Sequence, residues 1–574
     1  MVKEKYFIEI KEIIAKVLQE MGLSNPEIIS EIPPNPEMGD IAFPMFKFSK
    51  ELKMAPPQIS GIIKEKLSSM RIIERAEVKG PYLNLFLNRK IISKEILVTA
   101  LQQNVTIGTQ PDKNESVLIE FSCPNTNKPL HLGHCRNNAL GDSMARIYTK
   151  AGYKVNKVNL INDRGIHICK SMLAYKLFGN GVTPESAGKK SDHLVGEYYV
   201  KYAIESEKNP ELEKAAQEML VKWEQKDPET IELWTTMNKW AVDGIKKTYN
   251  RMGISFDNYQ YESETYLYGK DIIAEGLKKS VFYKEADGGV WINNEDVGLD
   301  KKIVLRSDGT SIYITQDIGT AAKRSELFGF DKMIYVVGSE QIYHFQTLFA
   351  IFKKLGFTWA DNCYHLSYGM VNLPEGKMKS REGKVIDADN LMELLHEMSY
   401  QVINEKHPEW SVDDMKSTAE KISLGALKYY LLNFTTSKDV MFIPEKSISF
   451  DGNTGPYLQY VTARINSLLI KAGDFKTTTA FDEYEYCETE WSVISKIADF
   501  DSVINKAALE YSPLEICSYL YELSKLYNKM YHDLQILNAD TEAAKTVRLM
   551  ITQSVHFVLK SGLNLLGIDS LEKM

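Results

Sequence analysis

The feature that most constrains this chain is a stretch at residues 117–151 that has the pattern of a strand, a tight loop and a helix. Residues 117–121 form a short apolar run, which is typical of a buried parallel strand. A loop rich in Pro and Asn follows, and His131-Leu-Gly-His134 opens a segment with helical spacing that ends near Gly152, an expected C-terminal cap. A helix N-terminus offers free backbone N–H groups and the positive end of the helix dipole. The stretch therefore predicts a phosphate site, with the two histidines as added donors.

The neighbouring sequence extends this stretch into a doubly wound α/β sheet. Strand and helix patterns alternate at residues 117–121, 134–151, 155–161 and 166–178. The sheet is expected to resume at residues 303–305, before the turn Arg306-Ser-Asp-Gly-Thr310 and a further apolar strand at residues 332–337. The charged, largely helical residues 185–300 are predicted to be an insertion in this Rossmann-type domain.

The chain has 574 residues, more than one hydrophobic core supports, so several domains are expected. Residues 1–110 are predicted to form a small α/β domain, and a polar linker follows at about 104–115. The Rossmann-type domain is predicted to span residues 115–395. Residues 396–574 are almost entirely helical in pattern and are predicted to form a bundle.

Composition excludes several classes of protein. No apolar run is long enough to span a membrane, and the N-terminus shows no apolar signal core. The six cysteines include no CxxC pair, which argues against a zinc knuckle or a redox dithiol and suits reduced thiols in the cytoplasm. Because the net charge is −8, any nucleic-acid partner must meet a local basic surface.

A second motif is a basic segment bracketed by glycines, Gly376-Lys-Met-Lys-Ser-Arg-Glu-Gly383. A lysine-rich segment is most often a solvated surface loop. Here the glycines would let the segment move, so Lys377, Lys379 and Arg381 could close on a triphosphate and leave with pyrophosphate. Chemistry of this kind depends on positioning and charge neutralisation, so this segment and the histidine motif form a specific pair.

The two motifs resemble the HIGH and KMSKS signatures of class I aminoacyl-tRNA synthetases, and further segments narrow the resemblance to the arginyl-tRNA synthetases. Those segments are Glu120-Phe-Ser-Cys-Pro-Asn125, Arg306-Ser-Asp-Gly-Thr-Ser-Ile-Tyr313, Gly338-Ser-Glu-Gln341 with His344-Phe345, and Gly452-Asn-Thr-Gly-Pro-Tyr-Leu-Gln-Tyr460. The resemblance covers nearly the whole chain. It implies a Rossmann-type catalytic domain, an additional N-terminal tRNA-binding domain and an all-α anticodon-binding bundle.

The resemblance also implies a set of arginine-binding residues, which are Glu120, Asn125, Tyr313, Asp317 and Gln341. A guanidinium is planar and always charged, and carboxylates hold it best in a forked geometry. Asp317 or Glu120 is expected to face it, while the others hold the α-amino and carboxylate groups. Glu120 stands in an apolar strand, where an unpaired charge would be costly, so a partner is required there.

ATP is expected across the mouth of the sheet, within the motif region Pro124, Asn125, Thr126, Asn127, Lys128, Pro129, Leu130, His131, Leu132, Gly133 and His134. By resemblance, the two histidines contact phosphates and Gly133 lets adenine approach the backbone. The remaining ATP-binding residues are expected to be Gly338 and Glu340 at the ribose, Met370 and Val371 near adenine, and Lys377. Mg2+ should bridge the phosphates, with no protein ligand assigned.

The basic segment departs from KMSKS, because the expected fourth-position lysine is a serine, Ser380. Many arginyl enzymes lack that lysine, and a lysine upstream of HIGH is thought to replace it. Lys128 stands there and is assigned the charge on the α-phosphate. Lys377 and Arg381 are assigned to the β and γ phosphates, and Lys379 is the alternative to Lys128.

The resemblance implies a two-step reaction in which tRNA is needed before activation. The arginine carboxylate attacks ATP to give arginyl-adenylate and diphosphate, and the 2′-hydroxyl of the terminal adenosine of tRNA(Arg) then takes the arginyl group. A monomer is expected. Contacts with tRNA are predicted at Tyr82, Asn84 and Phe86 on one face of a half-buried strand, at Tyr457, Tyr460 and Arg464 on one helix face, and at Met574.

The predicted tRNA-contact residues and the family assignment each have alternative interpretations. The aromatic strand face could be ordinary surface, and at least one of Tyr457 and Tyr460 could pack into the bundle. The rivals for the whole chain are another class I synthetase, a small-molecule nucleotidyltransferase and a non-catalytic tRNA-binding paralogue. Cysteinyl-type enzymes would show zinc-ligand cysteines, nucleotidyltransferases are much shorter, and a paralogue would be expected to lose motif residues that this chain keeps.

Overall fold

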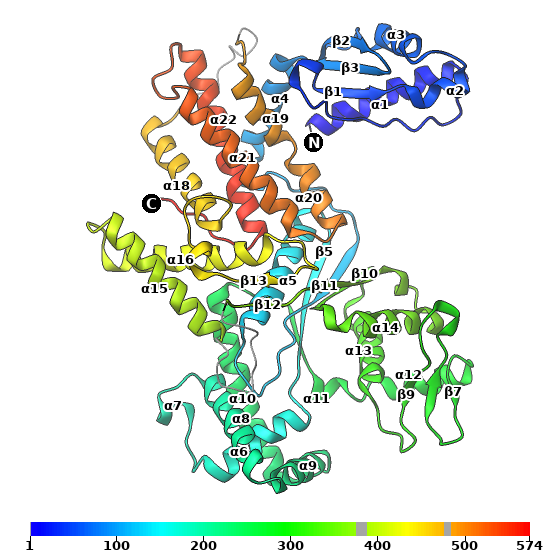
Figure 1. The fold of residues 1–574 in the computed structure, drawn as a ribbon, viewed down its shortest axis with the longest axis vertical. Helices are drawn as coiled ribbons and strands as arrows, with labels where there is room; N and C mark the ends of the chain where they lie inside the picture. Colours follow the sequence, from blue (N-terminus) through cyan, green and yellow to red (C-terminus); the bar gives the residue numbers. More distant parts are fainter. Residues whose placement is uncertain (1, 375–386, 476–483) are drawn as a thin grey trace.

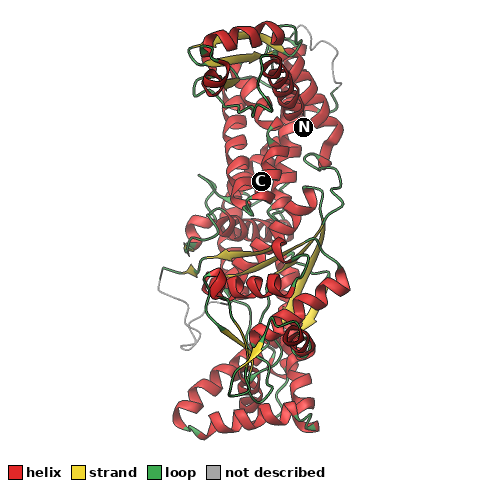
Figure 2. Cartoon of the chain, turned by 90° about the vertical axis from the view of Figure 1, so that its right-hand side faces the viewer, coloured by secondary structure: helices red, strands yellow, loops and turns green. Residues whose placement is uncertain are grey.

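The computed structural model describes residues 2–374, 387–475 and 484–574, and it places the regions of the chain in an elongated stack (Figures 1 and 2). A small N-terminal α/β domain lies at one end, and a column of C-terminal helices connects it to a central sheet. A helical insertion forms the other end. Within the described residues, no helix is long and apolar enough to cross a membrane.

The central sheet has five parallel strands in the order β11-β10-β4-β5-β6. Alternate residues of β4 point to opposite faces, as the period of a strand requires. Val117 and Ile119 join the core on the side of α5, whereas Leu118 joins the core on the side of α13 and α14. Both faces are therefore covered, which confirms the doubly wound fold. The bounds are β4 (Ser116–Glu120), α5 (Leu132–Lys150), β5 (Lys154–Ile161), β6 (Asn258–Tyr261), α13 (Tyr313–Phe328), β10 (Lys332–Gly338), α14 (Ile342–Leu355) and β11 (Cys363–Tyr368).

The prediction that the sheet resumes at residues 303–305 is wrong. These residues lie in β9 (Lys302–Leu305), which belongs to a separate antiparallel sheet with β7 (Tyr283–Lys284) and β8 (Val290–Ile292). The strand that extends the central sheet is β6, inside the range assigned to the insertion. Its sequence Asn-Tyr-Gln-Tyr lacks an apolar run because β6 is an edge strand with only Gln260 buried.

The helical part of the insertion has its own core between β5 and β6. Apolar side chains such as Met172, Val195 and Met237 meet there from different helices. The long helix α10 is bounded by the side-chain cap of Asp227 and by Gly253 in the left-handed region. The helices are α6 (Ile166–Phe178), α7 (Pro184–Ala187), α8 (Ser191–Lys208), α9 (Glu211–Glu224) and α10 (Pro228–Met252).

The N-terminal domain corrects one expectation about its aromatic strand. The strand β3 is the central strand of an antiparallel sheet, β1-β3-β2, so both of its edges are paired. Asn84 and Phe86 are only 2% and 8% exposed, and the Arg75 guanidinium lies 3.5 Å from the centroid of the Phe86 ring. The strand is not half-buried, and these two side chains form no open stacking face. The elements are α1 (Val2–Glu20), β1 (Ile41–Pro44), α2 (Ser49–Leu52), α3 (Pro56–Leu67), β2 (Ile73–Lys79), β3 (Tyr82–Leu87) and α4 (Arg89–Gln103).

The C-terminal helices confirm an all-α bundle. Leu520, Leu523, Tyr527 and Met530 form a buried stripe at helical spacing on α21. The core of the bundle is continuous with the cores of the N-terminal domain and of the α5 face of the sheet. The elements are α15 (Ala388–Lys406), α16 (Val412–Leu432), α17 (Pro444–Ser447), α18 (Gly455–Ala472), α19 (Glu488–Ala498), α20 (Phe500–Leu509), α21 (Pro513–Asp533) and α22 (Glu542–Leu565), with the short pair β12 (Val371–Asn372) and β13 (Val440–Met441) between them.

Candidate active site

The candidate site lies at the carboxyl ends of the parallel strands, where open α/β sheets bind ligands. Glu120 ends β4, Asp163 follows β5, and Glu262 follows β6. Gly338 ends β10 and leads into the single turn Ser339–Gln341. Because the strands run parallel, segments far apart in sequence meet at this one edge.

The two motif histidines are locked at the N-terminus of α5. The Nδ1 of His131 accepts the backbone N–H of Gly133 (3.1 Å), and the Nδ1 of His134 accepts that of His131 (3.1 Å). Burial, together with the charge of Lys128, lowers the pKa of His131 to about 4 and the pKa of His134 well below its usual range. Both rings are therefore neutral with the proton on Nε2, so each presents an N–H donor suited to a phosphate oxygen.

Gly133 has a steric role in this arrangement. A Cβ at this position would lie 3.0 Å from the His131 ring, and no other neighbouring group comes so near it. The ring centroids of His131 and His134 are 3.9 Å apart, so the turn is tightly filled. Glycine at position 133 therefore avoids a close contact with the His131 ring and leaves space beside the backbone of the turn.

Lys128 lies in the same loop as the histidines. Its side chain is half-buried, and this burial lowers the pKa of the amino group. Its charge lowers the pKa of both histidines and of His167, so the ammonium lies near these three rings.

The loop that leads to the histidines contains both buried and exposed side chains. Ser122 and Cys123 have positive φ angles of 75° and 45°, so the chain turns sharply at the end of β4. Asn125 is exposed, and its backbone pairs with that of Asn162 after β5. The residues whose side chains are buried, and which shape the loop rather than face a ligand, are Pro124, Thr126, Asn127, Leu130 and Leu132.

Glu120 has the partner that its apolar surroundings require, and the partner is internal. The buried guanidinium of Arg324 on α13 forms an ion pair with it. Arg324 also donates to Oε1 of Gln260 on β6 (2.7 Å), so one arginine connects β4, β6 and α13 beneath the site. Burial alone lowers the pKa of Arg324, but Glu120 raises it above its usual value. A neutralised Glu120 is a weak candidate for holding a second guanidinium.

Three other predicted arginine-binding residues lie on the first turns of α13 and directly after β10. Tyr313, the first residue of α13, is 77% exposed. Asp317 follows one helical turn later, and its carboxylate lies 2.7 Å from Nε2 of His344. Gln341 is exposed at the end of the turn that follows β10.

Glu262 is a residue that the sequence analysis missed. It is the first residue of α11 (Glu262–Thr265), directly after β6. Burial raises its pKa to about 7, the charge of Arg164 opposes this effect, and Asp163 and Asp317 add to it. Asp163 accepts the backbone N–H (2.8 Å) and the hydroxyl (2.7 Å) of Ser263, which holds the start of α11 in place. An acid directly after a sheet strand is the signal that could have found it, but β6 was not recognised as a strand.

The predicted ATP-binding residues beyond the histidines differ in how accessible they are. A Cβ on Gly338 would meet no atom within 4 Å, and Glu340 is exposed. Met370 is 45% exposed, whereas Val371 is buried, so only the backbone of Val371 could reach a ligand. The basic residues Lys377, Lys379 and Arg381 lie outside the described residues.

The predicted anticodon-side residues come together on α18. The Arg464 guanidinium lies 4.7 Å from the ring centroid of Tyr460 and 5.5 Å from that of Tyr531, a neighbour that the sequence analysis missed. Tyr457 packs edge-on against another tyrosine and accepts a hydrogen bond from Asn528 (2.8 Å). Tyr531 is 40% exposed, whereas Tyr457, Tyr460 and Arg464 are half-buried.

Met574 and Tyr82 are both less free than predicted. Met574 packs against a small apolar cluster that includes residues of α15 and α16. Tyr82 lies edge-on to Phe46, with ring centroids 6.2 Å apart, and is half-buried.

Comparison with known proteins gives matches along the whole chain. Residues 96–442 match the model of the class I (R) tRNA synthetase catalytic domain, residues 458–574 match the DALR anticodon-binding domain, and residues 8–87 match the arginyl-tRNA synthetase N-terminal domain. An arginine–tRNA ligase of Treponema denticola is 48% identical over 96% of this chain and 95% of its own length. One of Bacteroides thetaiotaomicron is 45% identical over 93% and 94%, respectively.

Solved structures agree with these matches. The chain is similar to the arginyl-tRNA synthetase of Thermus thermophilus, with a TM-score of 0.81, 25% identity and coverage of 98% of this chain and 99% of the other. The similarity in fold extends to the arginyl-tRNA synthetase of Plasmodium falciparum, with a TM-score of 0.80, 20% identity and coverage of 99% and 98%.

Proposed function

Because this chain belongs to the class I arginyl-tRNA synthetases and joins arginine to tRNA, we propose how its own residues divide that reaction. The observation that carries the proposal is a contrast within one site. Neutral N–H donors and a lysine lie at the N-terminus of α5, and carboxylates lie at the ends of β6 and along α13. The first group suits phosphate, and the second suits a guanidinium.

Arginine is held by Asp317 and Glu262 at its guanidinium in this proposal. Burial and two nearby acids raise the pKa of Glu262 despite the charge of Arg164, so a guanidinium in contact with it would stabilise its ionised form. Asp317 faces the same region from α13, and His344 orients its carboxylate. Asn125, Tyr313 and Gln341 are exposed around this pair and would hold the α-amino and carboxylate groups. Glu120 supports the pocket through Arg324.

Activation is proposed to take place between the two halves of the site. The arginine carboxylate attacks the α-phosphorus of ATP, the bond to the β-phosphate oxygen breaks, and diphosphate leaves. The ammonium of Lys128 and the Nε2–H groups of His131 and His134 stabilise the charge that develops on the phosphate oxygens. The two histidine rings are already held by backbone hydrogen bonds, so they need little reorganisation.

Mg2+ is proposed to bind through the ATP phosphates rather than in a protein cage. Asp387 is an acid beside the histidine turn, because its backbone pairs with that of His131. Its carboxylate, however, caps α15, where it accepts hydrogen bonds from the backbone N–H (2.8 Å) and the side-chain amide (2.7 Å) of Asn390. An ion that keeps phosphate and water ligands fits such surroundings, and it would neutralise phosphate charge when bound.

The second step transfers the arginyl group to tRNA(Arg), and we propose that tRNA must be bound before activation. The 2′-hydroxyl of the terminal adenosine attacks the activated carbonyl and AMP leaves.

The face formed by Tyr460, Arg464 and Tyr531 is proposed to bind unpaired anticodon bases by stacking and by the charge of Arg464. We further propose that the enzyme acts as a monomer in the cytoplasm.

ATP–diphosphate exchange tests this proposal. The enzyme is assayed with each amino acid separately, with and without tRNA(Arg). Exchange is expected only with arginine and only when tRNA is present. Exchange with another amino acid, or no exchange with arginine and tRNA together, would contradict it.

A further inference from the structure

A polar cluster outside the substrate site connects the helical insertion to the start of α15. The N-terminus of α15 lies against the histidine loop, because the backbone N–H of Ala388 donates to the carbonyl of Leu130 (2.8 Å). The adjacent Asp387 forms an isolated antiparallel bridge with His131. The position of α15 and the position of His131 are therefore coupled through the backbone.

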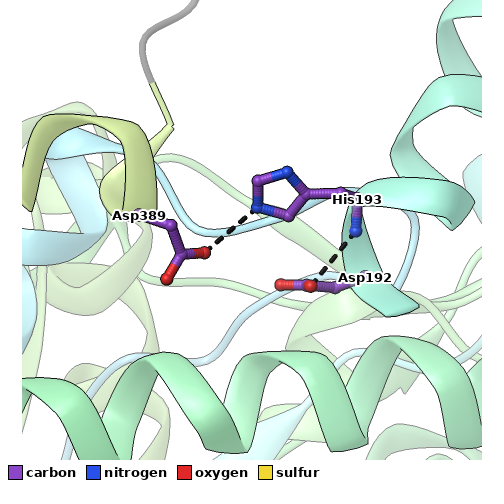
Figure 3. A group of neighbouring side chains, drawn as sticks. All are labelled: Asp192, His193 and Asp389. Carbon is purple, nitrogen blue, oxygen red and sulfur yellow. Dashed lines mark hydrogen bonds and ion pairs between the residues drawn. The ribbon is translucent and has the colours of Figure 1, made fainter. Parts of the chain in front are cut away.

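Asp389 lies in the first turn of α15 and reaches the insertion (Figure 3). Its Oδ2 accepts from Nζ of Lys190 (2.6 Å) and lies 3.1 Å from Nε2 of His193. The hydroxyl of Thr248 on α10 donates to the same carboxylate at 3.2 Å. The fully buried Asp192 accepts from Lys190 (3.0 Å) and from the backbone N–H of His193 (3.1 Å).

The cluster resembles a metal site but already contains its cation. Asp192, His193 and Asp389 could together reach one ion. The Lys190 ammonium, however, donates to both carboxylates and to the hydroxyl of Thr248 (2.6 Å). Burial alone would raise the pKa of Asp389, but the bonds from His193 and Lys190 lower it to about 2, and the same bond to Asp389 raises the pKa of His193. The cluster is thus a closed set of ion pairs.

A closed set of partly buried ion pairs contributes little net stability, because desolvation offsets the attraction between the charges. Its stronger effect is to select one geometry, since a shifted partner leaves a buried charge unpaired. In this protein, the ion pairs select the position of α8 and α10, which contribute to the insertion core, relative to the first turn of α15.

We propose that Lys190, His193 and Thr248 are positioning residues that fix Asp389 and, through the start of α15, the phosphate-binding position of His131. Adenylate formation then depends on correct docking of the insertion. The inference rests on the proposed roles of the histidines. A misplacement of about 1 Å can cost roughly 100-fold in rate, so a loosened cluster should act on kcat. Binding of arginine, at the other side of the site, should not change.

The test compares Lys190→Met, Asp389→Asn and the double variant in ATP–diphosphate exchange with arginine and tRNA. Each single variant should lower kcat about 10- to 100-fold, with the KM for arginine changed by less than about twofold. Because both changes break the same link, the double variant should be no slower than the slower single variant. Lys190→Arg should recover most of the rate.

Glu420→Gln is the matched control. Glu420 on α16 accepts a bidentate pair from Arg251 on α10 (2.8 and 3.1 Å), and its Oε2 lies 2.8 Å from Nδ1 of His396 on α15. It therefore also joins the insertion to α15, but about two turns beyond Asp389 and the histidine loop. It should keep a normal kcat. Thr248→Val, which removes only a hydroxyl, is a milder second variant in case the charge changes prevent folding, and it should lower kcat with the same unchanged KM for arginine.

Three results would overturn the proposal. These are a normal kcat in Lys190→Met and Thr248→Val, an equal loss in Glu420→Gln, and independent multiplicative losses in the double variant. A failure of the underlying function is distinguishable, because it would appear as absent exchange in the unsubstituted enzyme.

Discussion

The phosphate side and the arginine side of this site are built in opposite ways. The proposed phosphate side is one continuous stretch that contains Lys128, His131 and His134, and backbone hydrogen bonds within the turn orient the two histidine rings. The arginine side is assembled from the ends of β4 and β6 and the first turns of α13. A local turn can be encoded in a few residues, whereas a distributed pocket depends on the order of strands in the sheet.

The two sides also differ in how charge is managed. On the phosphate side, burial keeps the histidines neutral, so they donate hydrogen bonds without repelling Lys128 strongly. On the arginine side, burial raises the pKa of Glu262 to about 7, and the nearby acids Asp163 and Asp317 contribute to this shift. The first arrangement is complete before substrate binds, whereas the second is relieved by the cationic substrate.

The largest expected effect comes from removing the cation of the phosphate side. Lys128→Met should lower the rate of adenylate formation by roughly 100- to 1000-fold, the usual loss when one transition-state donor is removed. Affinity for tRNA should stay nearly normal. Single-turnover adenylate formation and tRNA filter binding measure the two quantities, and Lys379→Met is the comparison. Severe loss in Lys379→Met with an active Lys128→Met would reverse the assignment.

On the arginine side, Glu262→Gln should raise the KM for arginine on the order of 100-fold, because one charge-assisted pair to the guanidinium is lost. The kcat at saturating arginine should change much less. Glu264→Gln changes an exposed acid two residues away and should be silent. An unchanged KM in Glu262→Gln would remove Glu262 from the pocket.

The pH dependence sharpens the same contrast. The pKa of Glu262 is raised from 4.5 to about 7 in the free enzyme, so the carboxylate is increasingly protonated as pH falls below that value. Arginine must then displace a proton, and kcat/KM for arginine should fall by up to about tenfold per pH unit below 7. The affinity for ATP should not follow this trend, since the histidines stay neutral down to much lower pH.

Measuring kcat/KM for arginine between pH 5.5 and 8 checks this expectation, because this range covers the pKa of Glu262 and about one and a half pH units below it. The Glu262→Gln variant should show a flat profile in the same range. An identical fall in the variant would assign the titration to another group.

The smallest effect is expected away from both sides. Arg464→Met on α18 should weaken tRNA binding roughly five- to tenfold. It should also reduce the slope of log K against log salt concentration by about one, as expected for the loss of a single stacking and phosphate contact. Once tRNA is saturating, the exchange rate should be normal. A defect that persists at saturating tRNA would show that this face acts on catalysis as well as on binding.

Much of the fold could be predicted because several local signals agree. The strand, loop and helix at residues 117–151 were predicted nearly as they lie, since apolar runs and helical spacing reflect burial on both faces of the sheet. The strand β6 was missed, because an edge strand has too few buried residues to leave a pattern. Glu262 was missed with it.

The N-terminal strand shows the opposite error. The alternation of Tyr82, Asn84 and Phe86 with leucines predicted one open face. The strand is central in its sheet, and the neighbouring strand supplies Arg75 to cover Phe86. Alternation describes which residues share a face, but only the packed neighbours decide whether that face meets water.

The sequence by itself determined the residues that must act within one turn of chain. The order Lys128, His131, Gly133 and His134 predicts a phosphate-binding turn because backbone N–H groups and the two histidine rings meet within a few residues. Only the tertiary structure decided that Glu120 is satisfied by Arg324 rather than left for substrate, and that Asp389 is held by Lys190 from the insertion. The physical reason is that the state of a buried charge depends on whichever opposite charge the fold brings beside it, and that pairing is long-range in sequence.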